Sequence, residues 1–170
     1  ERHLFAELAA QRILGRHALE AAFKAGHEAL DGPFHGAHGR PLLSLFAGDE
    51  AALGPISLLP AVRCEWVGGY FGLSPKLGAT ASAGEHLELK ANAGRSFRAP
   101  SFGELYLEKG LSDPNPDLQP ETAGFVDFGA SARTGLLRAS VSGFYTLYDN
   151  LILYELYAPM RAKPFNFGKA

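Results

Sequence analysis

The chain has 170 residues and a formal net charge of −2, which is sufficient for one domain and gives no indication of a nucleic-acid partner. Its 20 glycines and 11 prolines favour a turn-rich β protein over a helical one. The single cysteine, Cys64, excludes an internal disulfide and leaves the redox compartment open. No apolar run reaches the roughly 18 residues that a membrane-spanning helix needs.

The two ends of the sequence predict a piece of a longer chain. Residue 1 is Glu1 rather than Met, and the charged and apolar stretches of a signal peptide do not follow it. The last residues, "NFGKA", still have a strand-like pattern.

The first thirty residues, which include "HLFAELAAQRILGRHALEAAFKAGHEAL", admit two interpretations. Their Ala, Leu and Glu content favours a helix. However, Leu19, Ala21 and Phe23 alternate with Glu20, Ala22 and Lys24, and Gly15 lies where a tight turn would be. We therefore predict two strands here, although propensity alone predicts a helix.

Alternation of apolar and polar residues continues along the chain and predicts an all-β fold. In residues 73–82, for example, Leu73 and Leu77 share one face of a strand, and Lys76 and Thr80 share the other. Many of the predicted strands exceed the usual length of about five or six residues. They are residues 2–12, 16–29, 41–51, 56–66, 72–82, 86–97, 121–133, 137–155 and 164–170.

The predicted connections fall into two classes that alternate along the chain. Short turns are predicted near residues 14–15, 53–55, 83–85 and 134–135. Mostly longer connections are predicted at residues 30–40, 67–71, 98–120 and 156–163. In an antiparallel up-and-down meander, one edge of the sheet would then carry the short turns and the other the long loops. This asymmetry, with strands of about nine to eleven tilted residues, is typical of transmembrane β-barrels of the outer membrane.

Two prolines, Pro60 and Pro75, lie inside predicted strands. Proline has no N–H to donate to a neighbouring strand. Each position therefore predicts a bulge or a lost hydrogen bond.

Two motifs separated by a variable stretch carry a family resemblance. They are "GRSFRAPSFGELY" at residues 94–106 and "NPDLQPETA" at residues 115–123. Together they resemble the barrel region of TonB-dependent outer-membrane receptors, which has Gly-x-x-Phe-Arg-Ala-Pro, Glu-Leu-Tyr, a variable loop and Asn-Pro-x-Leu-x-Pro-Glu. The matching residues are Gly94, Phe97, Arg98, Ala99, Pro100, Glu104, Leu105, Tyr106, Asn115, Pro116, Leu118, Pro120 and Glu121.

Weaker similarities to the same family extend over most of the chain, in "LLPAVRCEW", "LSPKLGATA", "SVSGFYTLYDNLILYE" and "FNFGKA". The resemblance implies that residues 1–170 form about nine strands of a barrel that has about 22 strands in this family. The plug domain, the TonB box and the terminal strands of such a receptor are expected outside this sequence.

The resemblance also implies a transport function. Such a receptor imports a scarce chelated nutrient, such as a ferric siderophore or a cobalamin, across the bacterial outer membrane, and the TonB complex energises it through the plug. We expect outer-membrane lipid around the barrel and neither a cofactor nor a bound metal. The sequence contains no nucleophile elbow, zinc-protease motif or phosphate-binding loop, so it predicts no enzyme.

On the barrel interpretation, the polar face of the strands lines the lumen and the apolar face meets lipid. The predicted lumen-facing residues are Lys76, Thr80, Glu88, Lys90, Asn92, Asp127, Ser140 and Ser142. The alternative is a soluble antiparallel β domain that binds a ligand or partner and buries its apolar face as a core. Alternation alone does not separate the two, but the paired motifs and the unequal edges favour the membrane.

The motif residues predict a rigid loop at the outer mouth of the barrel. The Arg98 guanidinium is a planar fork of donors that can pair with Glu104 and Glu121. Three prolines restrict the backbone of the loop: Pro100, Pro116 and Pro120. We expect this cluster to fold the loop rather than to touch a ligand.

Aromatic residues cluster at the predicted outer ends of the strands: Trp66, Tyr70, Phe71, Tyr106, Tyr145, Tyr148, Tyr154 and Tyr157. Barrels of the outer membrane carry aromatic girdles at the membrane interfaces. We predict this role for Tyr145, and the roles of the other aromatic residues stay open between a girdle, ordinary strand positions and a core.

His35 and His38 lie in a Gly-rich segment without a carboxylate or thiolate at fixed spacing, so solvated loop histidines are favoured over metal ligands. Cys64 falls on the apolar face, which favours a packed or lipid-facing thiol over a reactive one.

Overall fold

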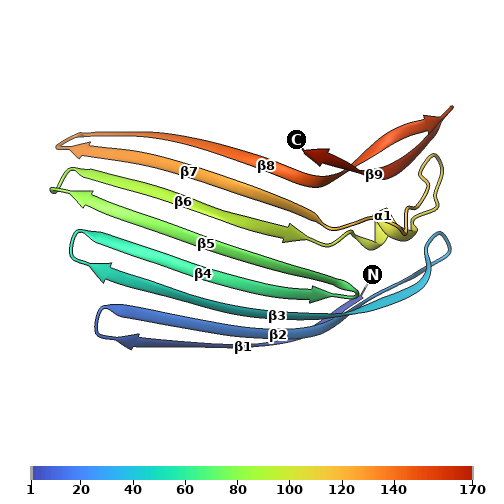
Figure 1. Ribbon diagram of the computed structural model, residues 1–170, viewed down its shortest axis with the longest axis horizontal. Helices are drawn as coiled ribbons and strands as arrows, with labels where there is room; N and C mark the ends of the chain where they lie inside the picture. The colour runs from blue at the N-terminus through green and yellow to red at the C-terminus, as the bar shows by residue number, and fades with distance from the viewer. Residues whose placement is uncertain (1, 170) are drawn as a thin grey trace.

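The computed structural model describes residues 2–169, which form one antiparallel sheet of nine strands. Each strand pairs with its neighbour in the chain, as Figure 1 shows, so the sheet is an up-and-down meander. The strands are β1 (Arg2–Leu14), β2 (His17–Gly32), β3 (Gly36–Leu53), β4 (Ile56–Val67), β5 (Tyr70–Ala83), β6 (Leu87–Arg98), β7 (Glu121–Thr134), β8 (Leu137–Ala158) and β9 (Arg161–Lys169).

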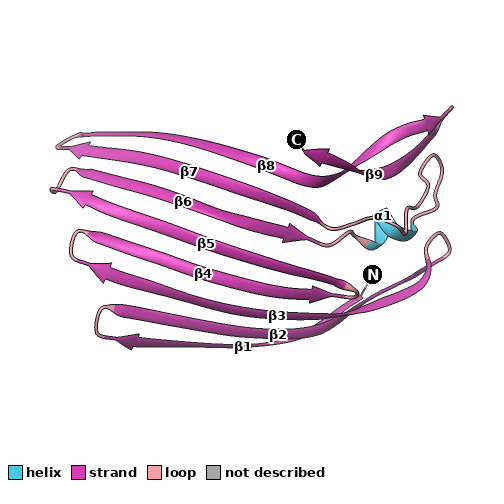
Figure 2. Cartoon of the chain, viewed as in Figure 1, coloured by secondary structure: helices cyan, strands magenta, loops and turns pink. Residues whose placement is uncertain are grey.

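The predicted all-β meander is confirmed. Two strands, β1 and β2, occupy the N-terminal stretch whose composition also favoured a helix, and they pair over their whole length from Arg2↔Ala29 to Leu14↔His17. Within residues 2–169 the helix content is α1 (Phe102–Tyr106), which lies between β6 and β7 (Figure 2). The last predicted strand extended to Ala170, which lies outside the described residues.

The prediction of long loops at one edge is wrong for three of the four connections. Only Gly68 and Gly69 separate β4 from β5. The segments predicted as loops at 30–40 and 156–163 mostly continue as paired strands, because backbone pairing persists to Gly32↔Gly36 and to Ala158↔Arg161. These two hairpins extend beyond the ends of β4 and β5 in Figure 1, so the edges differ mainly in strand length. Residues 99–120 are the remaining connection and form a true loop, called here the rim loop.

The two strand prolines coincide with gaps in the ladder rather than with bulges. Pairing of β3 with β4 is interrupted between Gly48↔Ala61 and Ala51↔Leu58, which leaves Pro60 without a partner on β3. Pairing of β5 with β6 stops at Lys76↔Gly94, one residue before Pro75. The register of β3 with β4 is the same on both sides of the gap at Pro60, whereas pairing of β5 with β6 does not resume beyond Pro75.

The register places all eight polar residues predicted to share a face on the same side of the sheet. Thr80 is opposite Lys90, and Asn92 is opposite Asp127 and donates a 2.7 Å hydrogen bond to its carboxylate. The same alternation links the remaining members, which lie on β5, β6 and β8: Lys76, Glu88, Ser140 and Ser142. We call this side the polar face.

The opposite side, called here the apolar face, exposes large aliphatic and aromatic side chains. They include Leu8, Leu19, Phe23, Leu45, Val62, Leu73, Leu77, Leu89, Val126, Phe128 and Val141. Cys64 lies on this face, opposite Leu45 and Leu73, and is partly buried.

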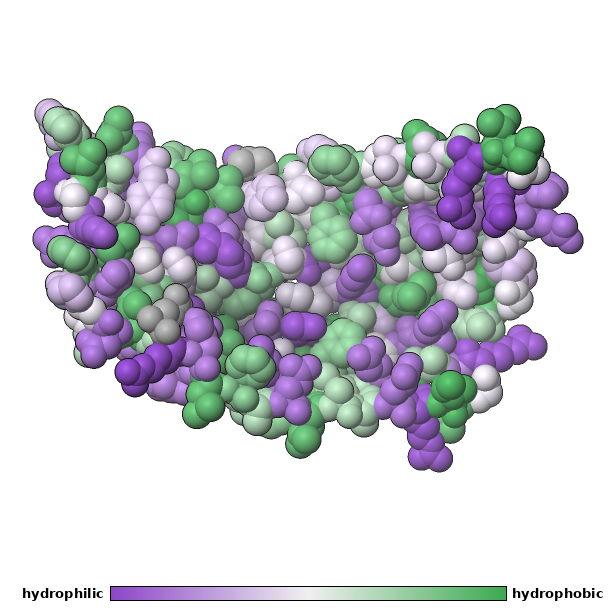
Figure 3. Space-filling view, turned by 180° about the vertical axis from the view of Figure 1, so that it is seen from behind, coloured by the Kyte–Doolittle hydropathy of each residue, from purple (hydrophilic) through white to green (hydrophobic). Residues whose placement is uncertain are grey.

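No second layer covers the strands within residues 2–169. The buried hydrophobic cluster consists of Leu105, Leu118 and Ile152 at one end of the sheet, and most strand residues are accessible. Figure 3 shows one side of the sheet, where hydrophilic and hydrophobic side chains are interspersed along the strands. In the described part of the chain, no helix has the length and apolar character needed to cross a membrane.

Gly72 on β5 lies so close to a neighbouring ring that a larger residue does not fit there. A Cβ added at Gly72 on β5 would overlap the ring of Phe97 on β6, the aromatic residue of the first motif. The ring therefore occupies the space beside the strand that a side chain at position 72 would need.

We expect Gly72→Ala to destabilise the protein by about 1–3 kcal/mol, because overpacking forces a ring or a strand to shift. Gly124→Ala is the matched control, since none of the described residues lies within 4 Å of a Cβ built there. Thermal unfolding of both variants measures the difference. Equal stability of the two variants would contradict the packing of Phe97 against Gly72.

Candidate functional site

The rim loop folds over the polar face of the sheet. Two side chains of that face, Arg40 on β3 and Tyr70 on β5, reach its backbone. Arg40 Nη1 donates to the Pro100 carbonyl over 2.7 Å, and the Tyr70 hydroxyl donates to the Leu118 carbonyl over 3.1 Å. The loop is therefore held from below by strands other than the two that it connects.

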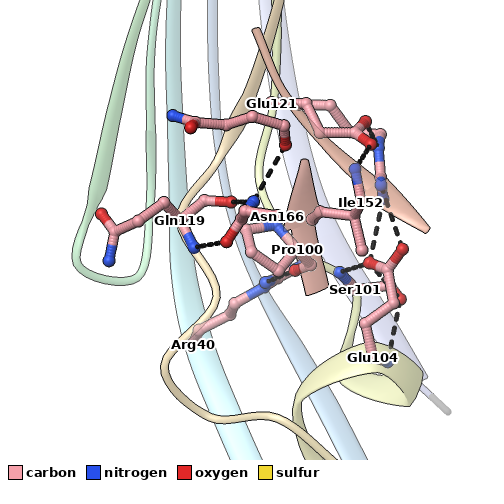
Figure 4. A network of polar contacts seen from close by, with 10 residues as sticks. Arg40, Pro100, Ser101, Glu104, Gln119, Glu121, Ile152 and Asn166 are labelled. Carbon is pink, nitrogen blue, oxygen red and sulfur yellow. Dashed lines mark hydrogen bonds and ion pairs between the residues drawn. The ribbon is translucent and has the colours of Figure 1, made fainter. Parts of the chain in front are cut away.

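Arg98, at the end of β6, joins the two ends of the rim loop. Its Nη1 and Nη2 donate to the two carboxylate oxygens of Glu104 over 3.0 Å each, and its Nε donates to Glu121. Glu104 belongs to α1 and Glu121 begins β7, as Figure 4 shows. The paired fork that the motif suggested is thus present, and we call these three residues the Arg98 clasp.

Both carboxylates of the Arg98 clasp make additional hydrogen bonds. Glu121 Oε1 accepts from the Ile152 N–H over 2.5 Å, which links the clasp to β8. Glu104 accepts from the Ser101 N–H over 2.7 Å, and the Glu104 N–H donates to Ser101 Oγ over 3.2 Å. This reciprocal pair is a capping box that begins α1.

The electrostatic environment of Glu104 favours its charged form. Partial burial alone would raise the pKa of this carboxyl, but the hydrogen bonds from Arg98 and Ser101 outweigh that effect. The pKa of Glu104 therefore lies below its usual range, so the clasp is ionised at neutral pH.

A small hydrophobic core lies beneath the rim loop. Leu105 of α1 and Leu118 of the second motif pack with Ile152 of β8, and Tyr106 packs against them. Leu118 is 1% exposed, and the Pro100 side chain is also fully buried. The apolar motif residues therefore fix the position of the loop, whereas Pro116 is exposed.

The rim loop is bonded to the β8–β9 hairpin on one side. Asn115 is buried and donates to the Pro164 carbonyl over 2.8 Å. The Gln119 N–H donates to Asn166 Oδ1 over 2.8 Å, and Asn166 Nδ2 donates back to the Gln119 carbonyl over 2.9 Å. Figure 4 shows Gln119 and Asn166 facing each other between the loop and β9.

A carboxylate of the rim loop, Asp113, makes a second link to this hairpin that the sequence analysis did not anticipate. Arg161 donates to both of its oxygens, Nε over 2.8 Å, and the Tyr157 hydroxyl donates to it as well. These hydrogen bonds hold the pKa of the Asp113 carboxyl below its usual range, with the Arg161 contribution the largest.

On its other side the rim loop contacts the β2–β3 hairpin. The rings of His38 and Tyr106 stack with centroids 3.6 Å apart and an interplanar angle of 3°. The Glu108 N–H donates to the Phe34 carbonyl over 2.9 Å. The expectation of a solvated loop histidine is thus wrong for His38, because a ring from a distant segment covers it.

His35 lies in the turn of the same hairpin, where its N–H donates to the Gly32 carbonyl. Within residues 2–169, no group of three or more His, Cys, Asp and Glu side chains is placed to hold a metal ion.

The aromatic residues at the outer ends separate into two groups. Trp66 and Phe71 lie on the apolar face with ring centroids 5.0 Å apart, and Tyr145 lies on the same face and is 60% exposed. Tyr70 and Tyr157 instead donate hydrogen bonds to the rim loop, and Tyr106 belongs to that loop. Tyr148 is on the polar face, opposite Ala123.

These features define a class of protein, the wall of a β-barrel with one polar face, one apolar face and an elaborated rim. The family described as "TonB dependent receptor-like, beta-barrel" matches residues 30–170. The chain belongs to this family.

A curated relative and several solved structures are similar to the chain. The vitamin B12 transporter BtuB of Photobacterium profundum is 35% identical over 68 residues, which cover 40% of this chain and 11% of BtuB. The siderophore receptor PirA from Pseudomonas aeruginosa has a TM-score of 0.83 at 24% identity, over 98% of this chain and 34% of PirA.

A mutant of the ferric enterobactin receptor PfeA from Pseudomonas aeruginosa also has a TM-score of 0.83, at 19% identity, over 98% of this chain and 31% of PfeA. At these identities the two solved structures establish the fold. The chain spans about a third of the length of each.

We expect Arg98→Lys to loosen the rim loop by about 1–3 kcal/mol, because lysine keeps the charge but cannot donate to both carboxylates in the same plane. Hydrogen exchange at the amides of Asn115 and Leu118 measures the opening. Arg138→Lys is the control, since Arg138 forms no ion pair with the residues between 2 and 169. Unchanged protection in Arg98→Lys would show that the clasp does not hold the loop.

Proposed function

We propose that the chain forms part of the barrel of an outer-membrane receptor that imports a chelated nutrient, such as a ferric siderophore or a cobalamin. The edge that carries the rim loop faces the outside of the cell. The polar face borders the lumen, and the apolar face meets lipid. Transport is energised by the TonB complex, which acts through a plug domain.

The observation that carries this proposal is the division of one sheet into two faces, with no second protein layer among the described residues. The polar face carries charged and hydroxyl side chains on five successive strands from β4 to β8. The apolar face exposes leucine, valine and phenylalanine side chains. A surface of this kind is costly in water and is stable against acyl chains.

The family supports the transport class, and the printed names of its relatives support the range of substrates. BtuB is named a vitamin B12 transporter, and PirA and PfeA are named receptors for a siderophore and for ferric enterobactin. Membership of the family favours the membrane interpretation over a soluble β domain, because the residues that match are those of a barrel wall.

The rim loop supports a capture role at the mouth of the barrel. It is attached to the β2–β3 hairpin through His38 and to the β8–β9 hairpin through Asn115, so three outer segments form one connected structure. Substrate-binding residues are therefore expected on the solvent side of this structure, whereas the Arg98 clasp supports it from beneath.

The assignment of the two faces makes a direct prediction. Leu77→Arg places a charge on the apolar face near the middle of β5, where we expect it to cost about 2–4 kcal/mol in a bilayer. Ser142→Arg places the same charge on the polar face, opposite Gly129, and should be tolerated. The fraction of complete receptor that assembles as a heat-modifiable band in outer membranes measures both. Equal assembly would contradict the proposed orientation.

Uptake is the test of the transport function. Cells that produce the complete receptor should accumulate either labelled ferric enterobactin or labelled cyanocobalamin above cells that lack it, and the difference should disappear in a strain without TonB. Accumulation of neither probe would remove these two substrates from the proposal. Accumulation that is independent of TonB would overturn the proposed energy source.

A further inference from the structure

A cleft of about 350 Å³ opens at the rim end of the sheet, where β6 separates from β5. Pairing of these two strands ends at Lys76↔Gly94, and Figure 1 shows β6 diverging from β5 beyond that point. The side chains that matter for its chemistry are Phe71, Leu73, Arg95, Phe97, Thr122 and Asp149.

The cleft belongs to the apolar face. Alternation along β5 and β6 from the pair Leu77↔Ala93 places Phe71, Leu73 and Arg95 on the same side as the exposed leucines. The Arg98 clasp lies on the opposite side of the sheet, whereas Gln119 and Pro120 of the rim loop line one wall of the cleft.

The walls of the cleft are mainly hydrocarbon. Phe71 is 54% exposed and Leu73 is 46% exposed, and the Phe97 ring fills the gap beside Gly72. Trp66 packs against Phe71 at the edge, which continues the aromatic surface. These side chains are suited to the upper part of an acyl chain and to the interface region of a bilayer.

One cation of the cleft, Arg95, has no carboxylate partner in the part of the chain that the structure describes. It is exposed, and its hydrogen bond to Thr122 Oγ1 is 3.3 Å long. Arg98, three residues further on, has two carboxylate partners. An arginine on a lipid-facing surface is costly unless an anion neutralises it or it reaches the interface.

Asp149 also lines the cleft, and its charge would oppose a bound anion. Its cross-strand partner in the register is Lys169 on β9, which places a second cation in the same row of the apolar face. Among the residues that line the cleft, the charges of Arg95 and Asp149 balance, so Asp149 weakens the attraction of an anion to Arg95, and Lys169 counteracts Asp149 from outside the lining.

We propose that this cleft binds the headgroup of an anionic outer-leaflet lipid, with the lipid phosphate on Arg95 and the acyl chain against Phe71 and Leu73. The inference rests on the proposed membrane orientation, because the apolar face must meet lipid for the cleft to be accessible to it. The site would hold a lipid at the junction of β5, β6 and β7, where β5 and β6 are no longer paired.

The experiment compares the complete receptor reconstituted with dioleoylphosphatidylglycerol or with dioleoylphosphatidylcholine, and native mass spectrometry counts the retained lipids. We expect Arg95→Gln to reduce retention of the anionic lipid by about fivefold, the effect of one basic residue near an anionic surface. Asp149→Asn should increase it. Arg12→Gln, on the apolar face at the other end of the sheet, is the matched control.

Equal retention of phosphatidylglycerol by the wild type, Arg95→Gln and Asp149→Asn would overturn the inference. A loss shared by Arg95→Gln and Arg12→Gln would show an effect of total charge and would also overturn it. Heat-modifiability of every sample separates this inference from the proposed function. A receptor that inserts but retains no anionic lipid contradicts the proposed lipid site alone. A receptor that does not insert contradicts the proposed membrane orientation.

Discussion

The two-residue period of the β-strand, fixed by an unshifted register, is the constraint on which the other features depend. From β1 to β8 the register has no shift, so each residue keeps its face from one end of a strand to the other. A slip of one residue would exchange the two faces of that strand. The polar face, the apolar face and the position of the rim loop over the former all follow from this pairing.

The rim loop is organised by contacts between distant parts of the chain rather than by its own secondary structure. Arg98 joins residues of α1 and β7, while Asp113 meets Arg161, which is 48 positions away. The links are ion pairs, hydrogen bonds and the stacking of Tyr106 on His38, and the apolar contacts of Leu118 lie beneath them. Ordering of the loop therefore depends on prior formation of the strands that it joins.

The sequence was sufficient for features with a local repeating pattern. Alternation predicted nine strands and the face of each polar residue, and the motif brought Arg98 together with Glu104 and Glu121 as an ion-paired group. The capping box was readable as well, because Ser101 and Glu104 have the spacing S-x-x-E, but it was missed.

What the sequence could not reveal depends on tertiary neighbours. Residues 30–40 were predicted to form a longer connection, whereas cross-strand hydrogen bonds keep this hairpin paired to its tip. His38 had no local partner in the sequence, and Tyr106, which stacks on it, comes from the rim loop. The loss of pairing at Pro60 and Pro75 without a bulge depends on how the adjacent strands accommodate the gap.

Nearest-neighbour pairing has a consequence for the order in which the structure forms. Since every strand pairs with the one before it in the chain, hairpins can be added one at a time, and each except β6–β7 needs only a short loop closure. Contacts of Asn115 with Pro164 and of Asp113 with Arg161 require β9 and are available only after that hairpin is in place. The rim thus closes at the end of assembly, and weakening it should speed disassembly while leaving the early hairpins unaffected.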